Sequence, residues 1–333
     1  MSPKYDLKEP KLIEKANGET YGLCRIPGLV LTEKGTLLGY YECRADYSDW
    51  SKIDIKVIRS TDKGDTFNTT LLIEGNGDTL NNPVMTVQDG TVHLLFMRNY
   101  SRLYYSKSTD DGVSFSKPRD ITYVLEQGER YTVAATGPGH GIVHNGNIIV
   151  PLWFGYNPND PKAHHPSSLR TLFSCDKGET WCLGEIIGED KLTDANESAL
   201  AITPDGRVLI SIRHCTEGVG KRALSVSPNG YSDWSTVRFC DNLPDPGCMG
   251  SMFSYGGKVY HVNCASTSGR KDLTLKESED CFDTCESVLV SSLGGYSDVA
   301  VGDSDIFVFF ERDLLHKKDV FNNDGLYFLR IEK

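Results

Sequence analysis

One short turn motif recurs along this chain and constrains its fold more than any other feature. Residues 60–67, 108–115 and 174–181 read STDKGDTF, STDDGVSF and SCDKGETW, which all fit Ser-x-Asp-x-Gly-x-Thr/Ser-aromatic. Two weaker copies follow at 227–234 and 278–285, the last with Phe282 in place of the glycine. The copies lie about 48 to about 66 residues apart, a spacing that indicates a repeat architecture such as a propeller. Because Asp can bond to the backbone and Gly accepts a positive φ, the motif favours a tight hairpin turn.

Short apolar or alternating segments lie between turn signals throughout the chain, and no long stretch keeps a helical period. The expected strands include 53–59, 92–97, 147–153, 207–212, 258–263 and 305–310. We therefore predict an all-β fold, a six-bladed β-propeller. A strand near 326–331 is expected to pair with an N-terminal strand, since closure of the propeller removes exposed sheet edges.

The 333 residues are expected to form one domain, 1–333, because no linker, charge block or low-complexity stretch interrupts them. With 39% hydrophobic residues the chain can bury a sizeable core. The N-terminus lacks the apolar run of a signal peptide, and no segment approaches membrane-spanning length. These features predict a cytoplasmic protein without a membrane partner, with a trimmed secreted protein as the alternative.

The formal net charge of −11 argues against nucleic acid or an anionic membrane as a partner, since both require clustered Lys and Arg. It does not argue against a small anion. A few converging arginines can reverse the sign of the potential in one cleft while the rest of the surface stays acidic.

The ten cysteines are scattered, and several lie in strand-like segments, such as Cys24, Cys43 and Cys175. This pattern predicts buried thiols rather than a disulfide framework. Cys281 and Cys285 have no second pair at the spacing of a zinc site, so we expect no metal.

A family resemblance rests on the order of several motifs along the chain. They are Arg25-Ile26-Pro27, the repeated turns, Gly137 to Ile142, Asn196-Glu197-Ser198, Arg213, Arg270 and Gly295-Tyr296-Ser297-Asp298. In this order they resemble the motifs of exo-α-sialidases of the non-viral, bacterial and animal type, whose repeated turns are called Asp-boxes. The resemblance extends over essentially the whole chain. It implies a retaining exo-α-sialidase that removes terminal sialic acid through a covalent tyrosyl intermediate and needs no cofactor.

The resemblance assigns a group of residues to substrate binding. Arg25, Arg213 and Arg270 resemble a triarginyl clamp for the sugar carboxylate, because guanidinium groups offer planar, bidentate donors that lysine lacks. Glu311 resembles the glutamate that orients the first of these arginines. Arg44 resembles the arginine near the ring hydroxyls.

The resemblance also assigns the catalytic groups. Tyr296 resembles the nucleophile, since the substrate carboxylate would repel the Asp or Glu that most retaining glycosidases use. A phenol with a pKa of about 10 needs a base when it attacks, and Glu197 resembles that base. Asp49 resembles the general acid in its mobile loop, with Asp46 as the alternative.

Each assignment has a purely structural alternative when its residue is taken alone. Arg25 could form a buried ion pair, Glu197 could lie in a solvated hairpin and Tyr296 could be a core aromatic. Their joint occurrence in family order favours the functional interpretation. The segment 163–166 is expected to be a solvated loop on the substrate side, and His140 to shape its own loop.

Two other functions remain open at this point. One is a hydrolase for a related 2-keto sugar acid, such as deaminated sialic acid, and the other is a sialoside-binding propeller that has lost catalysis. The expected partners are sialylated oligosaccharides or glycoproteins. Linkage preference, transfer to another sugar and oligomeric state are not predicted by the sequence.

Overall fold

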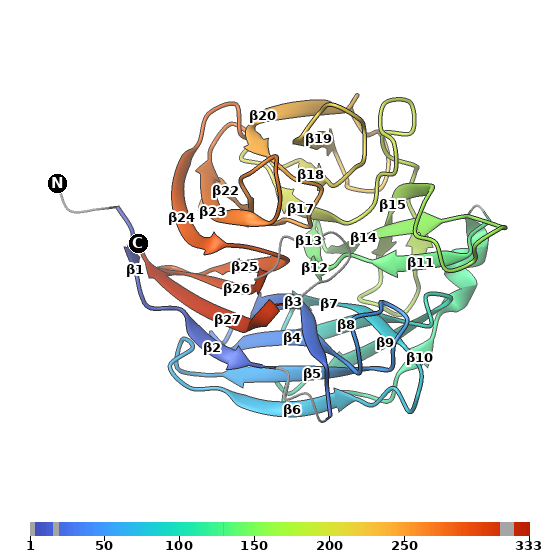
Figure 1. Cartoon of the computed structure of the whole chain (residues 1–333), viewed down its shortest axis with the longest axis horizontal. Helices are drawn as coiled ribbons and strands as arrows, with labels where there is room; N and C mark the ends of the chain where they lie inside the picture. The colour runs from blue at the N-terminus through green and yellow to red at the C-terminus, as the bar shows by residue number, and fades with distance from the viewer. Residues whose placement is uncertain (1–3, 16–19, 129, 314–322) are drawn as a thin grey trace.

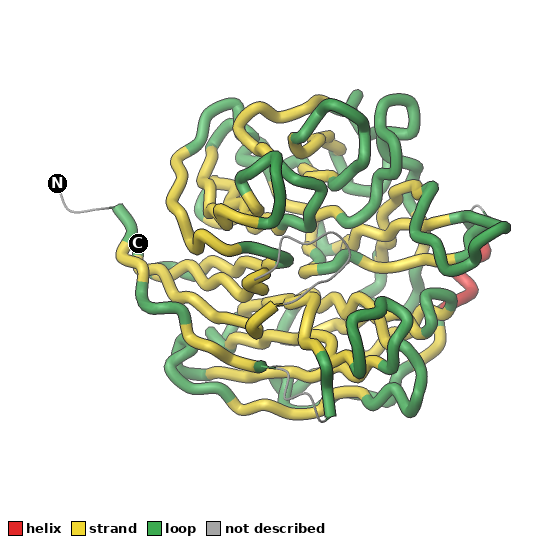
Figure 2. Tube along the Cα trace, viewed as in Figure 1, coloured by secondary structure: helices red, strands yellow, loops and turns green. Residues whose placement is uncertain are grey.

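The computed structural model describes residues 4–15, 20–128, 130–313 and 323–333. Its strands form six sheets, the blades of a β-propeller (Figure 1). In the described part of the chain the one helical segment is the short 3-10 helix η1 (Thr122–Gln127), red in Figure 2. No helix there is long and apolar enough to cross a membrane. The predicted all-β, six-bladed fold is confirmed.

The strands of blades 1 to 3 lie between Leu23 and Leu183. Blade 1 contains β3 (Leu23–Leu31), β4 (Leu37–Arg44), β5 (Ile53–Ser60) and β6 (Asn68–Ile73). Blade 2 contains β7 (Leu80–Gln88), β8 (Thr91–Arg98), β9 (Arg102–Ser108), β10 (Arg119–Asp120) and β12 (Gly139–His140). Blade 3 contains β11 (Val133–Thr136), β13 (Ile142–His144), β14 (Asn147–Gly155), β15 (Ser167–Ser174) and β16 (Cys182–Leu183). All pairs are antiparallel except that of β12 with β7.

The other three blades follow the same plan. Blade 4 contains β17 (Ser198–Ile202), β18 (Val208–Ile212), β19 (Lys221–Ser227) and β20 (Arg238–Pro244). Blade 5 contains β21 (Ser251–Tyr255), β22 (Lys258–Cys264), β23 (Lys271–Ser278) and β24 (Glu286–Leu293). Blade 6 contains β25 (Ser297–Val301), β26 (Asp305–Asp313) and β27 (Asn323–Glu332), together with β1 (Asp6–Leu7) and β2 (Lys11–Glu14). The six strands that were expected from the sequence fall in β5, β8, β14, β18, β22 and β26.

The propeller closes in blade 6, where the two ends of the chain meet. Both β1 and β2 pair antiparallel with β27, which places Leu7 opposite Ile331. A buried carboxylate also joins this blade to blade 1, because Asp305 accepts a hydrogen bond from Lys63 Nζ at 2.8 Å. The predicted pairing of a C-terminal with an N-terminal strand is therefore confirmed.

Each copy of the turn motif joins the last two strands along one blade. In the first copy Asp62 accepts a hydrogen bond from the Thr66 amide at 2.9 Å, and the corresponding bond in the last copy joins Thr284 to Asp280. Gly64 has a φ of 86°, and a Cβ there would lie 2.2 Å from the ring of Phe328, so this position requires glycine. The local hydrogen bonds explain why the motif is visible in the sequence.

The cysteines correspond only in part to the prediction. None of the ten, all of which lie in the described residues, forms a disulfide. Cys24 and Cys43 are buried opposite each other on β3 and β4, with their sulfurs 3.9 Å apart. The prediction of burial is wrong for Cys175, Cys182 and Cys215, which are exposed. Cys175 is the residue after the end of β15, in the third turn motif.

Candidate active site

One pocket is lined by residues from all six blades and encloses about 100 Å³. Its lining consists of Arg25, Ile26, Arg44, Asp49, Asn82, Tyr100, Trp153, His164, His165, Asn196, Glu197, Arg213, Arg270 and Tyr296. Seven of the eight residues that the sequence assigned to the site are among them. The eighth, Glu311, is outside the lining and accepts a hydrogen bond from Arg25.

The antiparallel blades explain why residues far apart in the sequence reach this pocket. Glu197 and Tyr296 immediately precede β17 and β25, the first strands of their blades. Arg44 ends β4 and Arg213 follows β18, which are second strands. In an antiparallel hairpin the start of one strand lies beside the end of the next, so all these positions occupy the same end of their blades.

Tyr296 and Glu197 form the central contact of the pocket. The phenol of Tyr296 donates to the carboxylate of Glu197, and its oxygen lies 2.6 Å from both Oε1 and Oε2. Arg213 pairs with the same carboxylate and donates to the phenol oxygen at 2.9 Å. Burial raises the pKa of Tyr296 above its usual value and the charge of Glu197 raises it further, while the nearby arginines act in the opposite direction. The arrangement holds a neutral phenol against a proton acceptor.

Two further arginines flank the same tyrosine. The guanidinium carbons of Arg25 and Arg270 lie 4.9 and 5.1 Å from the centroid of the Tyr296 ring. Glu311 accepts two hydrogen bonds from Arg25, from Nε and Nη2, both at 3.2 Å, and a third from the Ile26 amide at 2.9 Å. Because Arg25 and Glu311 are both buried, this bidentate pair fixes the direction of the guanidinium group.

Arg44 lies in a second charge network on blade 1. It is buried and pairs with Glu42 through Nη2 and with Asp49 through Nη1, each at 2.6 Å. Burial alone would raise the pKa of Asp49, but Arg44 and Arg25 outweigh it, so the pKa of this carboxyl lies below its usual value. Asp46 does not line the pocket. It is exposed, and its carboxylate accepts a hydrogen bond from the Ser48 amide at 2.7 Å.

Several residues in or behind the pocket lining were assigned no role by the sequence analysis. Glu42, which holds Arg44, is fully buried, and its position two residues before Arg44 puts both on one face of β4. Tyr100, Trp153 and His164 form an aromatic wall, with ring centroids 4.9 to 6.5 Å apart. No sequence motif marks this wall, since its residues come from separate loops and strands.

The wall carries two hydrogen-bonding groups that a ligand could use. Trp153 Nε1 and His164 Nε2 are buried and have no hydrogen-bond partner among the described residues. His164 is only half-buried as a residue and lies at the pocket, whereas the neighbouring His165 is exposed. The segment 163–166 is thus a loop at the pocket, with one of its histidines packed into the wall rather than solvated.

Two further groups of residues lie apart from the contact of Tyr296 with Glu197. His140 lines another pocket, together with Val30 and Phe253, and its Nδ1 lies 2.8 Å from the buried carboxylate of Asp298. Of the described residues, one group could hold a metal ion, namely His165, Asp194 and Cys215.

Comparison with known proteins identifies similar chains. Residues 69–301 match the family model described as a BNR repeat-like domain. A sialidase of Bacteroides fragilis is 27% identical over 311 residues, which cover 80% of this chain. The chain spans 55% of that relative's length.

Two solved structures with a similar fold are sialidases. The Hadza microbial sialidase Hz136 superposes with a TM-score of 0.79 at 23% identity, over 96% of this chain and 68% of the other. Trypanosoma rangeli sialidase, solved with 2,3-difluorosialic acid as a covalent intermediate, gives a TM-score of 0.75 at 17% identity, over 100% of this chain and 59% of the other. At these identities the likeness shows the fold alone.

Proposed function

This chain belongs to the BNR repeat-like domain family, and from that membership and its pocket we propose that it is a retaining exo-α-sialidase. It would hydrolyse terminal, α-ketosidically linked sialic acid from oligosaccharides or glycoproteins. The observation that carries the proposal is the contact of Tyr296 with Glu197 at 2.6 Å among three arginines. The named relatives and solved neighbours, which are sialidases, support it.

The arginines fit a substrate that carries a carboxylate on its anomeric carbon. Arg25, Arg213 and Arg270 line one pocket, so a planar carboxylate can accept charge-assisted hydrogen bonds from several guanidinium groups. Two of these groups flank the Tyr296 ring. A carboxylate held there would bring the anomeric carbon to the phenol oxygen.

Tyr296 would act as the nucleophile and Glu197 as its base. Because burial raises the pKa of Tyr296, the phenol is neutral near pH 7 and must lose its proton during attack. As the bond from Oη to the anomeric carbon forms, the phenol proton passes to Glu197. A carboxylate in the nucleophile's place would be repelled by the substrate carboxylate, which explains the use of tyrosine.

Asp49 would act as general acid and then as general base. It protonates the aglycone oxygen while the bond from the anomeric carbon to that oxygen breaks, and later it takes a proton from the water that attacks the tyrosyl intermediate. The Tyr296 oxygen then leaves and regains its proton from Glu197. Two displacements at one carbon give retention of configuration. The position of Asp49 at the pocket, and of Asp46 outside its lining, supports this choice.

The test combines turnover with covalent trapping. The protein and a Tyr296→Phe variant are incubated with a fluorogenic α-ketoside of N-acetylneuraminic acid, and separately with 2,3-difluorosialic acid followed by peptide mass spectrometry. Release of fluorophore by the parent alone, with an adduct on the Tyr296 peptide, supports the proposal. An adduct on another residue would overturn the assigned nucleophile.

The same assay separates the remaining alternatives. Turnover of the deaminated analogue alone would replace sialic acid by another 2-keto sugar acid as substrate. Binding of both sugars without turnover or adduct would show a non-catalytic propeller. Either result contradicts the proposal as stated.

A further inference from the structure

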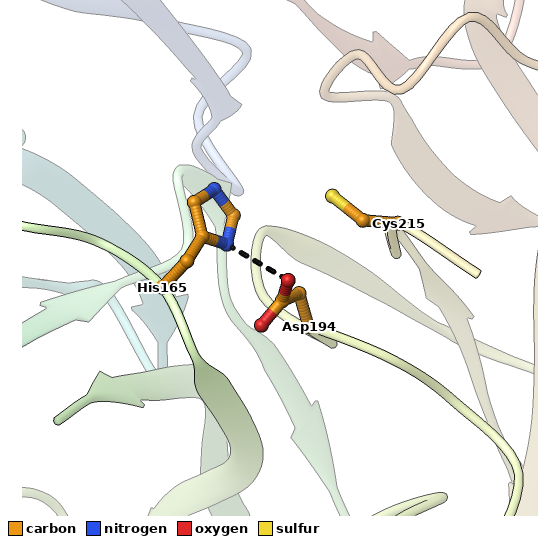
Figure 3. Close-up of side chains that lie close together, drawn as sticks. All are labelled: His165, Asp194 and Cys215. Carbon is orange, nitrogen blue, oxygen red and sulfur yellow. Dashed lines mark ion pairs between the residues drawn. The ribbon is translucent and has the colours of Figure 1, made fainter. Parts of the chain in front are cut away.

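Three potential metal ligands converge beside the pocket, although they are distant in the sequence. A ring nitrogen of His165, a carboxylate oxygen of Asp194 and Cys215 Sγ all lie within 4.8 Å of one another. Figure 3 shows the three side chains close together on separate segments, with the ion pair between His165 and Asp194 dashed. His165 precedes β15, Asp194 lies between β16 and β17, and Cys215 follows β18.

Their spacing is close to that of a tetrahedral zinc site. Bond lengths of about 2.0–2.3 Å from zinc to N, O and S place neighbouring ligand atoms about 3.3–3.7 Å apart. His165 Nδ1 and Asp194 Oδ2 are already 3.4 Å apart. Because the sulfur of Cys215 lies within 4.8 Å of the other two ligand atoms, it must come closer to them by about 1.5 Å at most, which a rotation of this exposed side chain allows.

The backbone holds the ligand-bearing loops together without a metal. The Cys215 amide donates to the carbonyl of Thr193 at 2.8 Å, and the Thr193 amide donates to Thr216 Oγ1 at 3.0 Å. Asp194 Oδ1 accepts from the Ser167 amide at 2.9 Å, which leaves Oδ2 directed to His165. Because these contacts pre-organise the group, an ion would need little rearrangement to bind.

We propose that His165, Asp194 and Cys215 bind one Zn²⁺ at the rim of the pocket, with water as the fourth ligand. One nitrogen, one oxygen and one sulfur donor suit zinc, whereas Ca²⁺ and Mg²⁺ require oxygen ligands. On binding, the Cys215 thiol releases its proton to solvent and its sulfur bonds to the ion.

The site is joined directly to the catalytic residues. His165 itself lines the pocket, Asp194 is three residues before Glu197, and Cys215 is two residues after Arg213. The backbones of Glu197 and Arg213 are hydrogen-bonded, with the Arg213 amide donating to the Glu197 carbonyl at 3.1 Å. Bound zinc would therefore keep the ring of His165 in the metal cluster, away from an entering aglycone. Zinc binding is therefore expected to lower kcat/KM several-fold, an expectation that rests on the proposed function.

Direct binding is measured with Co²⁺ as a spectroscopic probe and with Zn²⁺ by calorimetry, on the full chain kept reduced with a non-thiol reductant. One equivalent of Co²⁺ is expected to give a sulfur-to-cobalt charge-transfer band that Zn²⁺ removes. Cys215→Ser should abolish the band, and Asp194→Asn should weaken binding at least tenfold. Asn keeps the acceptor for Ser167 and tolerates the φ of 53° at this position, so the loop stays folded.

The matched control is the double variant Cys175→Ser with Cys182→Ser, which removes the other two exposed thiols. It should bind Co²⁺ as the parent does. Loss of the band in this control, its persistence in Cys215→Ser, or displacement of Co²⁺ by Ca²⁺ would overturn the zinc site.

Turnover with and without Zn²⁺ separates this proposal from the function. A charge-transfer band in a chain that cleaves no sialoside supports the metal site and refutes the enzyme. Turnover that Zn²⁺ does not change, in a chain with the band, would overturn the coupling of the site to the pocket.

Discussion

The phenol oxygen of Tyr296 lies 2.6 Å from both carboxylate oxygens of Glu197, although 99 positions separate the two residues. They meet because each immediately precedes the first strand of its blade, in blades 4 and 6. The contact joins a neutral phenol to a proton acceptor, and it is the basis of the first prediction.

Glu197→Gln should lower kcat about 10²–10⁴-fold with a smaller effect on KM, because Gln keeps a hydrogen-bond acceptor but cannot take the phenol proton. Steady-state kinetics with the fluorogenic sialoside measure both kcat and KM. Tyr296→Phe should cause a similar loss, and the double variant should be little worse than either, since both residues act in one step. Additive losses in the double variant would argue against a shared role.

Glu311→Gln should lower kcat/KM about 10–100-fold, mainly through KM, because Arg25 loses charge-assisted hydrogen bonds of about 1.5–3 kcal/mol. Kinetics and competition by free sialic acid check this. The control is Glu277→Gln, which removes a carboxylate that pairs with Lys4 and Lys258, outside the pocket lining. An equal rise of KM in the control would contradict a specific effect on the clamp.

The activity should depend on pH through Asp49, whose pKa lies below its usual value because of Arg44 and Arg25. The acid form is therefore depleted as pH rises through the acidic range, and kcat/KM for sialosides with sugar aglycones should fall with it. An aryl aglycone, which leaves without full protonation, should be less sensitive. The pH profiles of two such substrates test the expectation.

Asp49→Asn extends this test to the residue itself. It should slow cleavage of a sugar aglycone about 10²–10⁴-fold and cleavage of an aryl aglycone much less. Asp46→Asn, which changes an exposed residue outside the pocket lining, should leave both rates near the parent's. The reverse pattern would assign the acid to Asp46.

Asp305→Asn should destabilise the closure of the propeller. Asp305 is buried and accepts hydrogen bonds from Lys63 at 2.8 Å and from Arg330 at 2.7 Å. Burial opposes the charged form, but these bonds outweigh it and lower the pKa of Asp305 from 3.8 to about 2. The free energy of unfolding at pH 7 should fall by about 1–3 kcal/mol.

The direction of the pKa shift of Asp305 determines the pH range in which its carboxylate stabilises the fold. A carboxyl with a lowered pKa in the folded state stabilises the fold above its unfolded pKa and loses that effect as pH falls through the folded value. The difference between parent and variant should thus be complete above about pH 4 and vanish towards pH 2. Urea unfolding across this range measures it. Asp241→Asn, which breaks a pair on the surface, should leave stability unchanged.

The blades could be predicted from the sequence because turns and strands are encoded by residues close together in the chain. In the turn motif, Asp62 bonds to an amide only four residues away, so residue identity alone reports the turn. Strands such as 92–97 and 147–153 were visible through their apolar pattern. The burial of Cys175 was predicted wrongly, since exposure depends on which neighbouring blade covers a position.

The sequence by itself determined the propeller, its closure and the types of residue available for chemistry, because turn hydrogen bonds and strand periodicity act within a few residues. The tertiary structure alone decided distances between side chains of different blades. It brought Tyr100 of blade 2 against Trp153 and His164 of blade 3, and it gathered His165, Asp194 and Cys215 into one cluster. These contacts depend on how the six blades pack around a common centre, and no local pattern of residues encodes that geometry.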